Sequence, residues 1–545
     1  MIEVRRNVAA VFIIALSAVE VVAQRGERLA IDTAELGRRL RDLSADSMQG
    51  RYPGTTGESL TRTYLIKELT SFGVRPGVNG GWLQPVVIGA HRPSPDSPQP
   101  TARLSGRLTR ELEHGRDLRF ANYSRAANVS VGGDLVFVGY GIDAPLYAWN
   151  DFDGVDLKGK IAIALLGEPA LKDDTVRFNG GRASRFSWTT DKIEAMADRG
   201  AVGVLWVRPT GSLSRAPVAG PSYVVTHVSP GAVKFSGNIT ESTLGELLPP
   251  DSEKLAALMA RAARPGFHAL PLNVRLDVSF GTRSSTVNSN NVVGVVRGTD
   301  ANLANEHVVI SAHWDAYGIG APVNGDSIYN GALDDGSGMT AALALARVFA
   351  ANPQPRSITF VFTTAEEMGL LGARAFVCSG PLQMDRVVAN LNLDDGLELF
   401  GPKKDVAPLG VELSSLGRTV AEVARAKGLR VSPDPFPHEG FFLRADNFPF
   451  ARAGVPALYV ALGTEDATQP AGFTVNKTNE YLRQHYHRPS DDYATVVHDL
   501  RGALQFAEFA RDLTIAVARS RERPQWNAGA EFSRPTRGSP PPACR

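Results

Sequence analysis

The chain has 545 residues, of which 43% are hydrophobic and 21% are charged. These fractions are close to those of globular proteins, and they exclude a disordered, collagen-like or coiled-coil chain. Lys and Arg number 58 and Asp and Glu number 57, so the net charge is +1 and no bulk positive field exists for nucleic acid. The two cysteines cannot form a four-thiolate zinc site or an iron–sulfur cluster, so any metal must be held by His and carboxylate side chains.

The first residues have the order of a secretory signal. Arg5 and Arg6 give a basic start, and the apolar run Val8–Val19 is too short for a helix that crosses the ~30 Å core of a bilayer. Small residues up to Ala23 then offer a cleavage site. We predict a signal peptide over 1–23 and a secreted or periplasmic protein without stable membrane association after cleavage. The alternatives are an uncleaved N-terminal anchor or a misassigned start.

The next segments are expected to form an N-terminal part of the main domain, an inserted module and, at the far end, a tail. Helical spacing over 32–46 and 58–72 indicates two helices within the N-terminal part, 24–118. Residues 119–284 contain short β-rich runs bounded by glycine and no cluster of candidate catalytic residues, which favours a packing or lid module. Residues 521–545 are rich in Pro, Gly, Arg and Ser, and this composition predicts a disordered tail.

From 285 to 520 the pattern becomes regular. Near-continuous Val/Ile/Leu strands, such as HVVISAH, SITFVFTTA and VVANLNLD, alternate with helical segments such as GMTAALALARVFA. This alternation predicts an α/β fold with a doubly wound, mainly parallel or mixed sheet and helices on both faces. Ligands in such sheets bind outside the carboxyl ends of the strands, so we expect the functional site at that edge.

Side chains that can bind metal follow several of these strands. They are His313, Asp315, Asp334, Asp335, Glu366, Glu367, Asp394, Asp395, His485 and His487. Each motif taken alone has a common structural explanation, such as a carboxylate at a helix start, a turn or an N-cap. Their shared position favours a site, because carboxylates at such an edge are costly unless they are paired or hold a cation.

The donor types indicate which metal such a site would take. Two histidines and several carboxylates without a thiol suit zinc or a similar divalent ion. A bridging carboxylate with two further ligands on each side would hold two ions about 3.5–4 Å apart. A carboxylate beside a ligand is then a natural general base, and the neighbours Glu366 and Glu367 offer that division of roles.

These residues lie in motifs that resemble the co-catalytic di-zinc exopeptidases of the MH clan. That group includes secreted aminopeptidases, glutamate carboxypeptidase II and the transferrin-receptor ectodomain. The matching motifs, in the family's order, are SAHWDAYG, NGALDDGSG, TTAEEMGLLGARAF, NLNLDDG and YHRPSDD. The middle of the chain is similar to a protease-associated (PA) domain. The resemblance covers most of the chain and implies a zinc-exopeptidase fold, with a PA-like domain inserted at 119–284 and the catalytic zinc peptidase domain at 285–520.

Carried over position by position, the resemblance implies two Zn²⁺ ions per chain. His313 and Asp394 would bind one ion, and Glu367 and His487 would bind the other. Asp334 would bridge the two ions.

The resemblance also implies roles for residues that do not bind metal. Glu366 would be the general base, and Tyr486 would stabilise the oxyanion. Asp315 would hydrogen-bond His313 and fix its orientation. Arg444 is a candidate contact for a substrate carboxylate, or else forms a salt bridge.

The implied function is a secreted, zinc-dependent metallopeptidase, an exopeptidase and foremost an aminopeptidase, which acts on peptides with a free N-terminus. Two alternatives stay within the resemblance. A glutaminyl-cyclase-like acyltransferase would keep one zinc ion, and a receptor-like ectodomain would be catalytically silent. The presence of both histidines, the bridging carboxylate and the base favours the peptidase.

Overall fold

A computed structural model describes residues 30–92, 94, 96–124, 126–169, 177–178, 183–215, 222–225, 232–534 and 544. The predicted signal peptide, 1–23, lies outside the described residues. The chain divides into two units. The first comprises Met1–Pro85, Ser289–Pro435 and Ala445–Ala543, and the second comprises Val86–Asn288, Phe436–Arg444 and Cys544–Arg545.

The first unit is built on a mixed sheet whose centre is parallel. Its strands lie in the order β14 (Arg283–Val296), β18 (Ser357–Thr363), β15 (His307–His313), β19 (Val387–Leu393) and β22 (Ala457–Val460), with β1 (Arg75–Pro76) beside β14. The last four strands of this order are parallel, whereas β14 runs antiparallel to β18. The strands β15, β18 and β19 are buried along nearly their whole length, as expected for strands covered on both faces.

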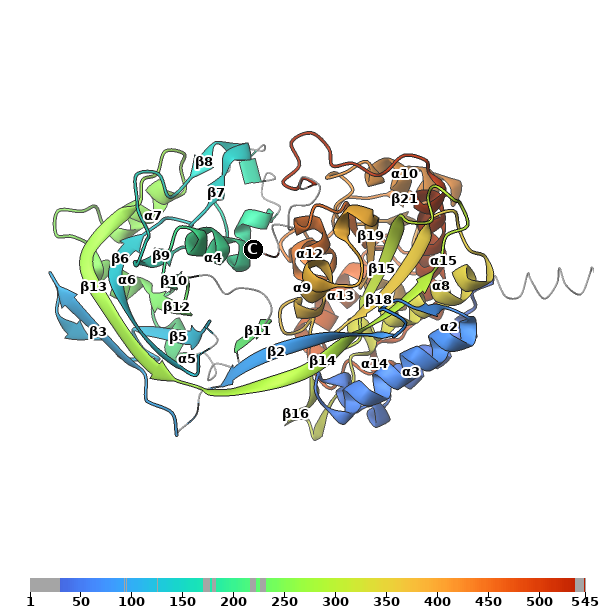
Figure 1. Ribbon diagram of the computed structural model, residues 1–545, viewed down its shortest axis with the longest axis horizontal. Coiled ribbons are helices and arrows are strands. Elements are labelled where there is room, and N and C mark those ends of the chain that lie inside the picture. Colours follow the sequence, from blue (N-terminus) through green and yellow to red (C-terminus); the bar gives the residue numbers. More distant parts are fainter. Residues whose placement is uncertain are drawn as a thin grey trace, which may run out of the picture. The chain divides into compact units, whose positions relative to one another are not determined.

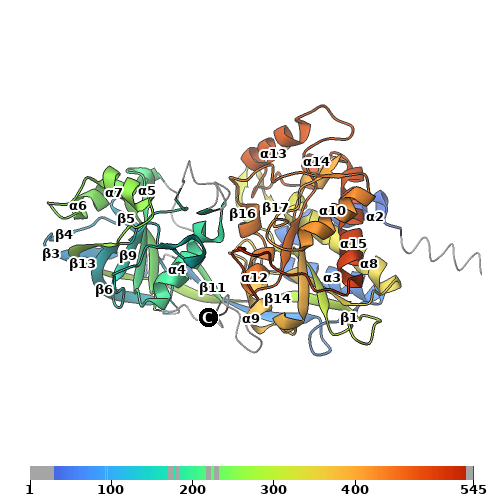
Figure 2. The same cartoon turned by 90° about the horizontal axis from the view of Figure 1, so that it is seen from above.

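Helices cover both faces of this sheet, and the predicted fold class is confirmed (Figures 1 and 2). On one face lie α2 (Thr33–Leu43), α3 (Thr56–Phe72), α8 (Ser337–Ala351) and α15 (Leu500–Arg519). On the other face lie α9 (Leu371–Ser379) and α12 (Asn447–Arg452). Further helices are α10 (Leu416–Ala426), α13 (Phe473–Gln484) and α14 (Tyr493–Val496). The helices α2 and α3 correspond to the two that helical spacing predicts before residue 73.

The contact between α8 and β19 depends on a glycine. A Cβ atom on Gly338 would lie 1.9 Å from the main-chain oxygen of Leu393 and 2.3 Å from Oδ1 of Asp335. The Gly338 N–H donates to that same Asp335 oxygen over 2.9 Å, which caps the first turn of α8. The missing side chain therefore lets the helix start close to the end of the strand.

The second unit holds a second mixed sheet with helices on two sides. Its strand order is β4 (Arg110–Glu111), β3 (Thr101–Gly106), β13 (Leu270–Gly281), β6 (Asn128–Phe137), β9 (Ile161–Ala164), β10 (Gly203–Arg208), β12 (Phe235–Thr240) and β5 (Leu118–Asn122). One apolar core includes residues of α6 (Glu241–Leu247) and α7 (Leu255–Ala262), and another includes residues of α4 (Thr189–Asp198).

The boundaries of the units differ from those expected at 118/119 and 284/285. The second unit begins at Val86 because β3, which lies before residue 119, pairs with β13 along its full length. Sequence periodicity does not reveal this pairing, because the two strands are separated by more than 160 residues. The first unit resumes at Ser289, within β14.

The C-terminal segment up to residue 534 is ordered, which corrects the expected disordered tail over 521–545. Trp526 Nε1 donates to the main-chain oxygen of Gly454 over 3.0 Å, and Phe532 is 4% exposed. The Arg534 guanidinium donates to the oxygens of Val387 and Val388 over 3.2 and 3.1 Å. Composition alone indicated disorder, but two aromatic residues and an arginine supply enough contacts to hold the segment. Residues 535–543 and 545 lie outside the described part of the chain.

Two further findings concern the chain as described. Both cysteines, Cys378 and Cys544, are disulfide-bonded, so neither is a free thiol. Among the described residues, every helix is either too short or too polar to cross a bilayer.

Candidate metal centre

The candidate ligands of the sequence come together at the carboxyl edge of the parallel strands. His313 ends β15, Asp394 directly follows β19, and Glu367 lies in the loop after β18. Asp334 lies just before α8, and His487 follows α13. Because parallel strands end at one edge of a sheet, segments far apart in the chain deliver their polar groups to the same place.

One carboxylate lies between the two histidines. Oδ1 of Asp334 is 3.0 Å from Nε2 of His313, and Oδ2 is 3.3 Å from Nε2 of His487. On the outer sides, Oδ1 of Asp394 lies 3.8 Å from His313 Nε2 and Oε2 of Glu367 lies 3.2 Å from His487 Nε2. The five side chains thus form two groups that share the Asp334 carboxylate.

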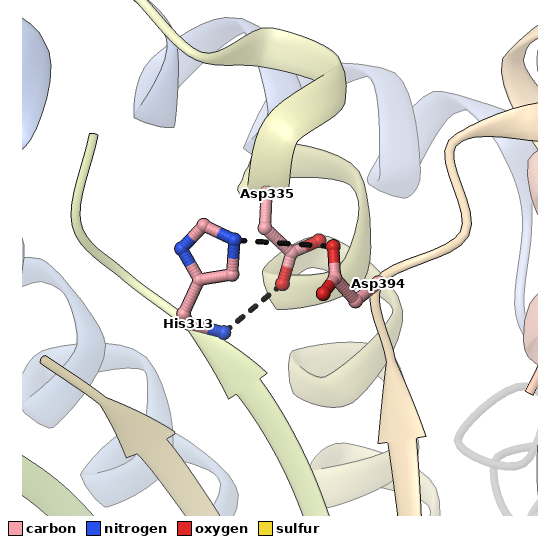
Figure 3. A group of neighbouring side chains, drawn as sticks. All are labelled: His313, Asp335 and Asp394. Atoms are coloured by element: carbon pink, nitrogen blue, oxygen red, sulfur yellow. Dashed lines mark hydrogen bonds and ion pairs between the residues drawn. The ribbon is translucent and has the colours of Figure 1, made fainter. Parts of the chain in front are cut away.

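Among the described residues, candidate ligand atoms also fall into two groups, without a shared member, in which all atoms lie within 4.8 Å of one another. The groups as they stand are His313, Asp335 and Asp394, shown in Figure 3, and Asp334, Glu367 and His487. Asp335 received no role from the sequence. Its Oδ2 accepts the N–H of His313 over 3.0 Å and its Oδ1 caps α8, so its carboxylate ties the end of β15 to the start of that helix.

The Asp315 side chain, fully buried, makes different contacts from the expected one. Nδ1 of His313 lies 3.1 Å from the main-chain oxygen of Asp315 but 3.7 Å from its Oδ1, beyond hydrogen-bond distance. The carboxylate instead accepts the N–H of Glu366 over 3.1 Å and that of Glu367 over 3.3 Å. Asp315 therefore orients His313 through its backbone, and its side chain fixes the loop that carries Glu366, the expected base, and Glu367, an expected ligand.

Burial and mutual repulsion govern the electrostatics of this edge. Burial, followed by the negative charges of Glu367 and Asp394, raises the pKa of Glu366 well above its usual value, against the attraction of His313. Burial likewise raises the pKa of Asp394 to about 8. Burial opposes charge on Asp334 too, but the adjacent His313 and His487 outweigh it and lower the pKa of that carboxyl. A cluster of this kind favours a bound cation.

Sequence reasoning missed Tyr317. Its hydroxyl lies 2.8 Å from Nδ1 of His487 and also hydrogen-bonds the carboxylate of Glu367. Burial, followed by the charge of Glu367, raises the pKa of Tyr317. The residue stands two positions after Asp315 within SAHWDAYG, so the motif contained it, but no pattern of spacing assigned it a partner.

Two further residues singled out by the sequence, Tyr486 and Arg444, have simple local surroundings. The ring of Tyr486 lies against that of His487, with centroids 3.5 Å apart and planes inclined by 31°. Arg444 lies 3.6 Å from Oε2 of Glu439, as in the salt-bridge alternative.

The donor set fits zinc. Nε2 of His487 is buried and has no hydrogen-bond partner, although it faces two carboxylates. The Nδ1 atoms of His313 and His487 each face an oxygen that can accept their proton, which leaves both Nε2 lone pairs for a metal. Imidazole and carboxylate groups without thiolates are the ligands that zinc accepts in catalytic sites.

Comparison with known proteins agrees with this geometry. Residues 291–510, which contain every predicted ligand, match peptidase family M28. This matched stretch, called the M28 region below, spans about two fifths of the chain. The matched region contains the whole parallel part of the sheet and the loops that carry the metal centre.

Three curated relatives of the M28 region illustrate its range. A vacuolar membrane protease of Kluyveromyces lactis is 35% identical over 120 residues, which are 22% of this chain and 12% of that protein. A probable leucine aminopeptidase 2 of Aspergillus oryzae is 25% identical over 33% of this chain and 35% of its own. A probable zinc metalloprotease of Pyrenophora teres f. teres is 26% identical over 36% and 41%. The aligned part is thus about a tenth to two fifths of these relatives' length.

Among solved structures, an aminopeptidase from Aneurinibacillus sp. strain AM-1 has 20% sequence identity and a TM-score of 0.49. The match covers 91% of this chain and 96% of that one.

The comparisons contradict the secreted or periplasmic location expected from the first residues. Several fungal relatives of the M28 region, from Kluyveromyces, Eremothecium and Candida species among others, are named vacuolar membrane protease. A location at an internal membrane differs from export. The error arose because the expectation rested on the N-terminal residues alone, which lie outside the described part of the chain.

Proposed function

We propose that the chain is a zinc-dependent metallopeptidase of the exopeptidase class, and foremost an aminopeptidase. The observation that carries the proposal is the shared carboxylate, since the two oxygens of Asp334 face His313 on one side and His487 on the other. Such a shared carboxylate suits two ions about 3.5–4 Å apart. The names of two relatives, a probable leucine aminopeptidase and a probable zinc metalloprotease, support the same class.

In this proposal the ligands divide into two sets. His313 and Asp394 would hold one zinc ion, Glu367 and His487 would hold the other, and the carboxylate of Asp334 would be available to both. The separations of 3.0 to 3.8 Å between these ligand atoms support the division, because ligands of one ion must lie close together. The proposal gives Asp335 a positioning role, because its two oxygens accept the main-chain N–H groups of His313 and Gly338.

The chain's own groups would then carry out proton transfer and charge stabilisation. When bound, zinc would supply Lewis acidity and make a water molecule acidic enough to attack near neutral pH. Glu366 would accept the proton of that water and return it to the leaving amine. Tyr486, beside His487, would donate a hydrogen bond to the oxyanion.

The alternatives have less support. A cyclase-like acyltransferase with one zinc ion has no need of the second group around Glu367 and His487. A silent ectodomain has no need of Glu366. We also propose that the second unit is an accessory module related to PA domains, because both ligand groups found among the described residues belong to the first unit.

The test is a panel of chromogenic peptides with free and blocked N-termini. Leucine p-nitroanilide and its N-acetyl form are incubated with the full chain, before and after removal of metal by a chelator and after return of Zn²⁺. We expect hydrolysis of the free-amine substrate only, loss of activity on chelation, recovery with zinc and a content near two zinc ions per chain.

Other outcomes have clear meanings. Cleavage of the blocked substrate would contradict an aminopeptidase, and activity unaffected by the chelator would contradict a metallopeptidase. One zinc ion per chain, together with cyclisation of an N-terminal glutamine, would favour the acyltransferase.

A further inference from the structure

A wholly buried arginine lies beneath the metal centre. Arg51 ends the short helix η1 (Asp46–Arg51), has a φ of 49° and is 0% exposed. Buried arginines usually pair with a carboxylate, because an isolated charge is costly to remove from water. Every hydrogen bond that the structure gives the Arg51 guanidinium goes instead to a main-chain oxygen.

These oxygens belong to the two loops that carry the metal ligands. Nε donates to Trp314 over 2.8 Å, Nη2 donates to Gly331 over 2.8 Å, and Nη1 donates to Asn330 over 2.5 Å. A further bond from Nη1 reaches Leu43, at the end of α2, over 2.8 Å. Trp314 directly follows a proposed ligand, and Gly331 precedes the bridging carboxylate by three residues. One planar group thus connects both loops to the N-terminal helices.

The glycine at position 331 allows Arg51 to approach the loop before Asp334. A Cβ atom on Gly331 would lie 2.7 Å from Nη2 of Arg51 and 2.4 Å from the main-chain oxygen of Asp334, and the φ of 60° favours glycine. The side chain of Asn330 strengthens the same connection, since its Nδ2 donates to Ser44 over 2.8 Å and to Asp46 over 2.9 Å.

The positive charge of the Arg51 guanidinium also interacts with carboxylates around the candidate metal centre. Four buried or half-buried carboxylates attract it, namely Asp491, Asp335, Asp315 and Asp334. Asp491 in turn accepts the N–H of Leu333 over 2.9 Å and that of Asp334 over 3.2 Å. A fixed positive charge near these groups reduces their mutual repulsion, and its N–H groups are engaged by main-chain oxygens and not by the ligand carboxylates.

We propose that Arg51 is a positioning residue for the metal centre, which sets the spacing of the His313 loop and the Asp334 loop and balances the charge of the carboxylates behind them. The part of this proposal that concerns metal affinity rests on the proposed function. The part that concerns the two loops does not.

A lysine at position 51 would separate the effect of the charge from the effect of the hydrogen bonds. It keeps the positive charge, but its three donors sit on one nitrogen and cannot reach oxygens on three segments. Residues that orient metal ligands typically contribute about 10–100-fold to metal affinity. We therefore expect Arg51→Lys to weaken zinc binding at least about 10-fold.

The first unit offers a matched control. Arg356 is also 0% exposed, donates to the main-chain oxygens of Val517 and Ser520, and pairs with Glu306 over 2.7 Å. None of these partners belongs to a ligand loop. Arg356→Lys is therefore expected to cause a similar loss of stability, because it also replaces a buried arginine, but it leaves the loops of the candidate metal centre unchanged.

The experiment compares wild type, Arg51→Lys and Arg356→Lys as full chains. Zinc affinity is measured by competition with a chromophoric chelator, and hydrogen exchange of peptides that cover 313–318 and 330–336 is measured in the metal-free proteins. We expect at least 10-fold weaker zinc binding and faster exchange in both loops for Arg51→Lys, and unchanged zinc affinity and loop exchange for Arg356→Lys. If Arg51→Lys does not fold, the uncharged Arg51→Gln replaces it.

Two results would overturn the inference, namely wild-type zinc affinity and loop exchange in the Arg51 variant, or equal losses in both variants. If wild type itself binds no zinc, the proposed function fails, but the hydrogen exchange still decides whether Arg51 holds the loops.

Discussion

The hydroxyl of Tyr317 lies 2.8 Å from Nδ1 of His487. For Nε2 of His487 to bind a metal, Nδ1 must carry the ring proton, and this N–H then donates a hydrogen bond to the Tyr317 hydroxyl. The hydroxyl can in turn donate a hydrogen bond to Glu367. One tyrosine thereby orients both ligands that are proposed to belong only to the second ion. The orientation of a metal ligand by such a partner commonly affects metal affinity and activity.

Tyr317→Phe is expected to weaken binding of one of the two zinc ions about 10–100-fold and to leave the other nearly unchanged. A two-site zinc titration against a chelator would measure this. Tyr329→Phe is a suitable control, because the Tyr329 hydroxyl donates to Ala321 within the hairpin of β16 (Gly318–Val323) and β17 (Asp326–Tyr329). An equal effect of both variants would contradict the role of Tyr317.

Replacement of the proposed base should separate catalysis from metal binding. Glu366→Gln keeps the shape of the side chain but removes the proton acceptor, so we expect turnover to fall about 10²–10⁴-fold. Zinc content should stay near two ions per chain. Glu367→Gln, at the adjacent proposed ligand, should instead reduce zinc content. Near-normal turnover of Glu366→Gln would exclude it as the base.

A histidine at the opposite end of β15 predicts part of the pH dependence of stability. Burial, followed by the positive charges of Arg386 and Arg297, lowers the pKa of His307 from 6.5 to about 4. Between these values the unfolded chain binds a proton that the folded chain does not. As far as His307 is concerned, the free energy of unfolding is therefore highest above about pH 6.5. It falls by up to about 3 kcal/mol as the pH decreases through this window.

Urea unfolding of wild type and His307→Gln at pH 7 and at several values down to pH 4.5 would test this. The variant should lose less stability than wild type over the same interval. The carboxylates titrate in both proteins, so their contribution cancels in the comparison. Parallel losses in the two proteins would contradict the neutral state of His307.

The ordered C-terminal segment should contribute to stability. Phe532 is 4% exposed, and its ring centroid lies 5.1 Å from that of Trp526 and 6.2 Å from that of Phe448. We expect Phe532→Ala to lower the free energy of unfolding by about 3 kcal/mol, because the change removes a buried aromatic ring. Leu60→Ala, at a leucine that is 40% exposed, should cost much less. If Phe532→Ala had no effect, the segment would be loose in solution.

Much of the fold, and the gathering of candidate metal-binding side chains at one edge of the sheet, could be predicted from local patterns. Runs of buried apolar residues indicated β15, β18 and β19, and the rule that ligands bind beyond the carboxyl ends of parallel strands led to His313 and Asp394. The boundary before the second unit could not be predicted, because β3 pairs with a strand more than 160 residues away. The C-terminal segment was misjudged because composition does not reveal contacts such as that between Trp526 and Gly454.

The sequence by itself determined which residue types could hold a metal and that they would meet at one edge of a sheet, because the alternation of apolar strands with helices indicates parallel strands whose carboxyl ends share an edge. Only the tertiary structure decided how those residues are held. The bonds from Arg51 to the oxygens of Trp314 and Gly331 join segments more than 260 residues apart, and they end on main-chain atoms that every residue possesses. No residue type marks such an acceptor, so the contact exists only once the chain has folded.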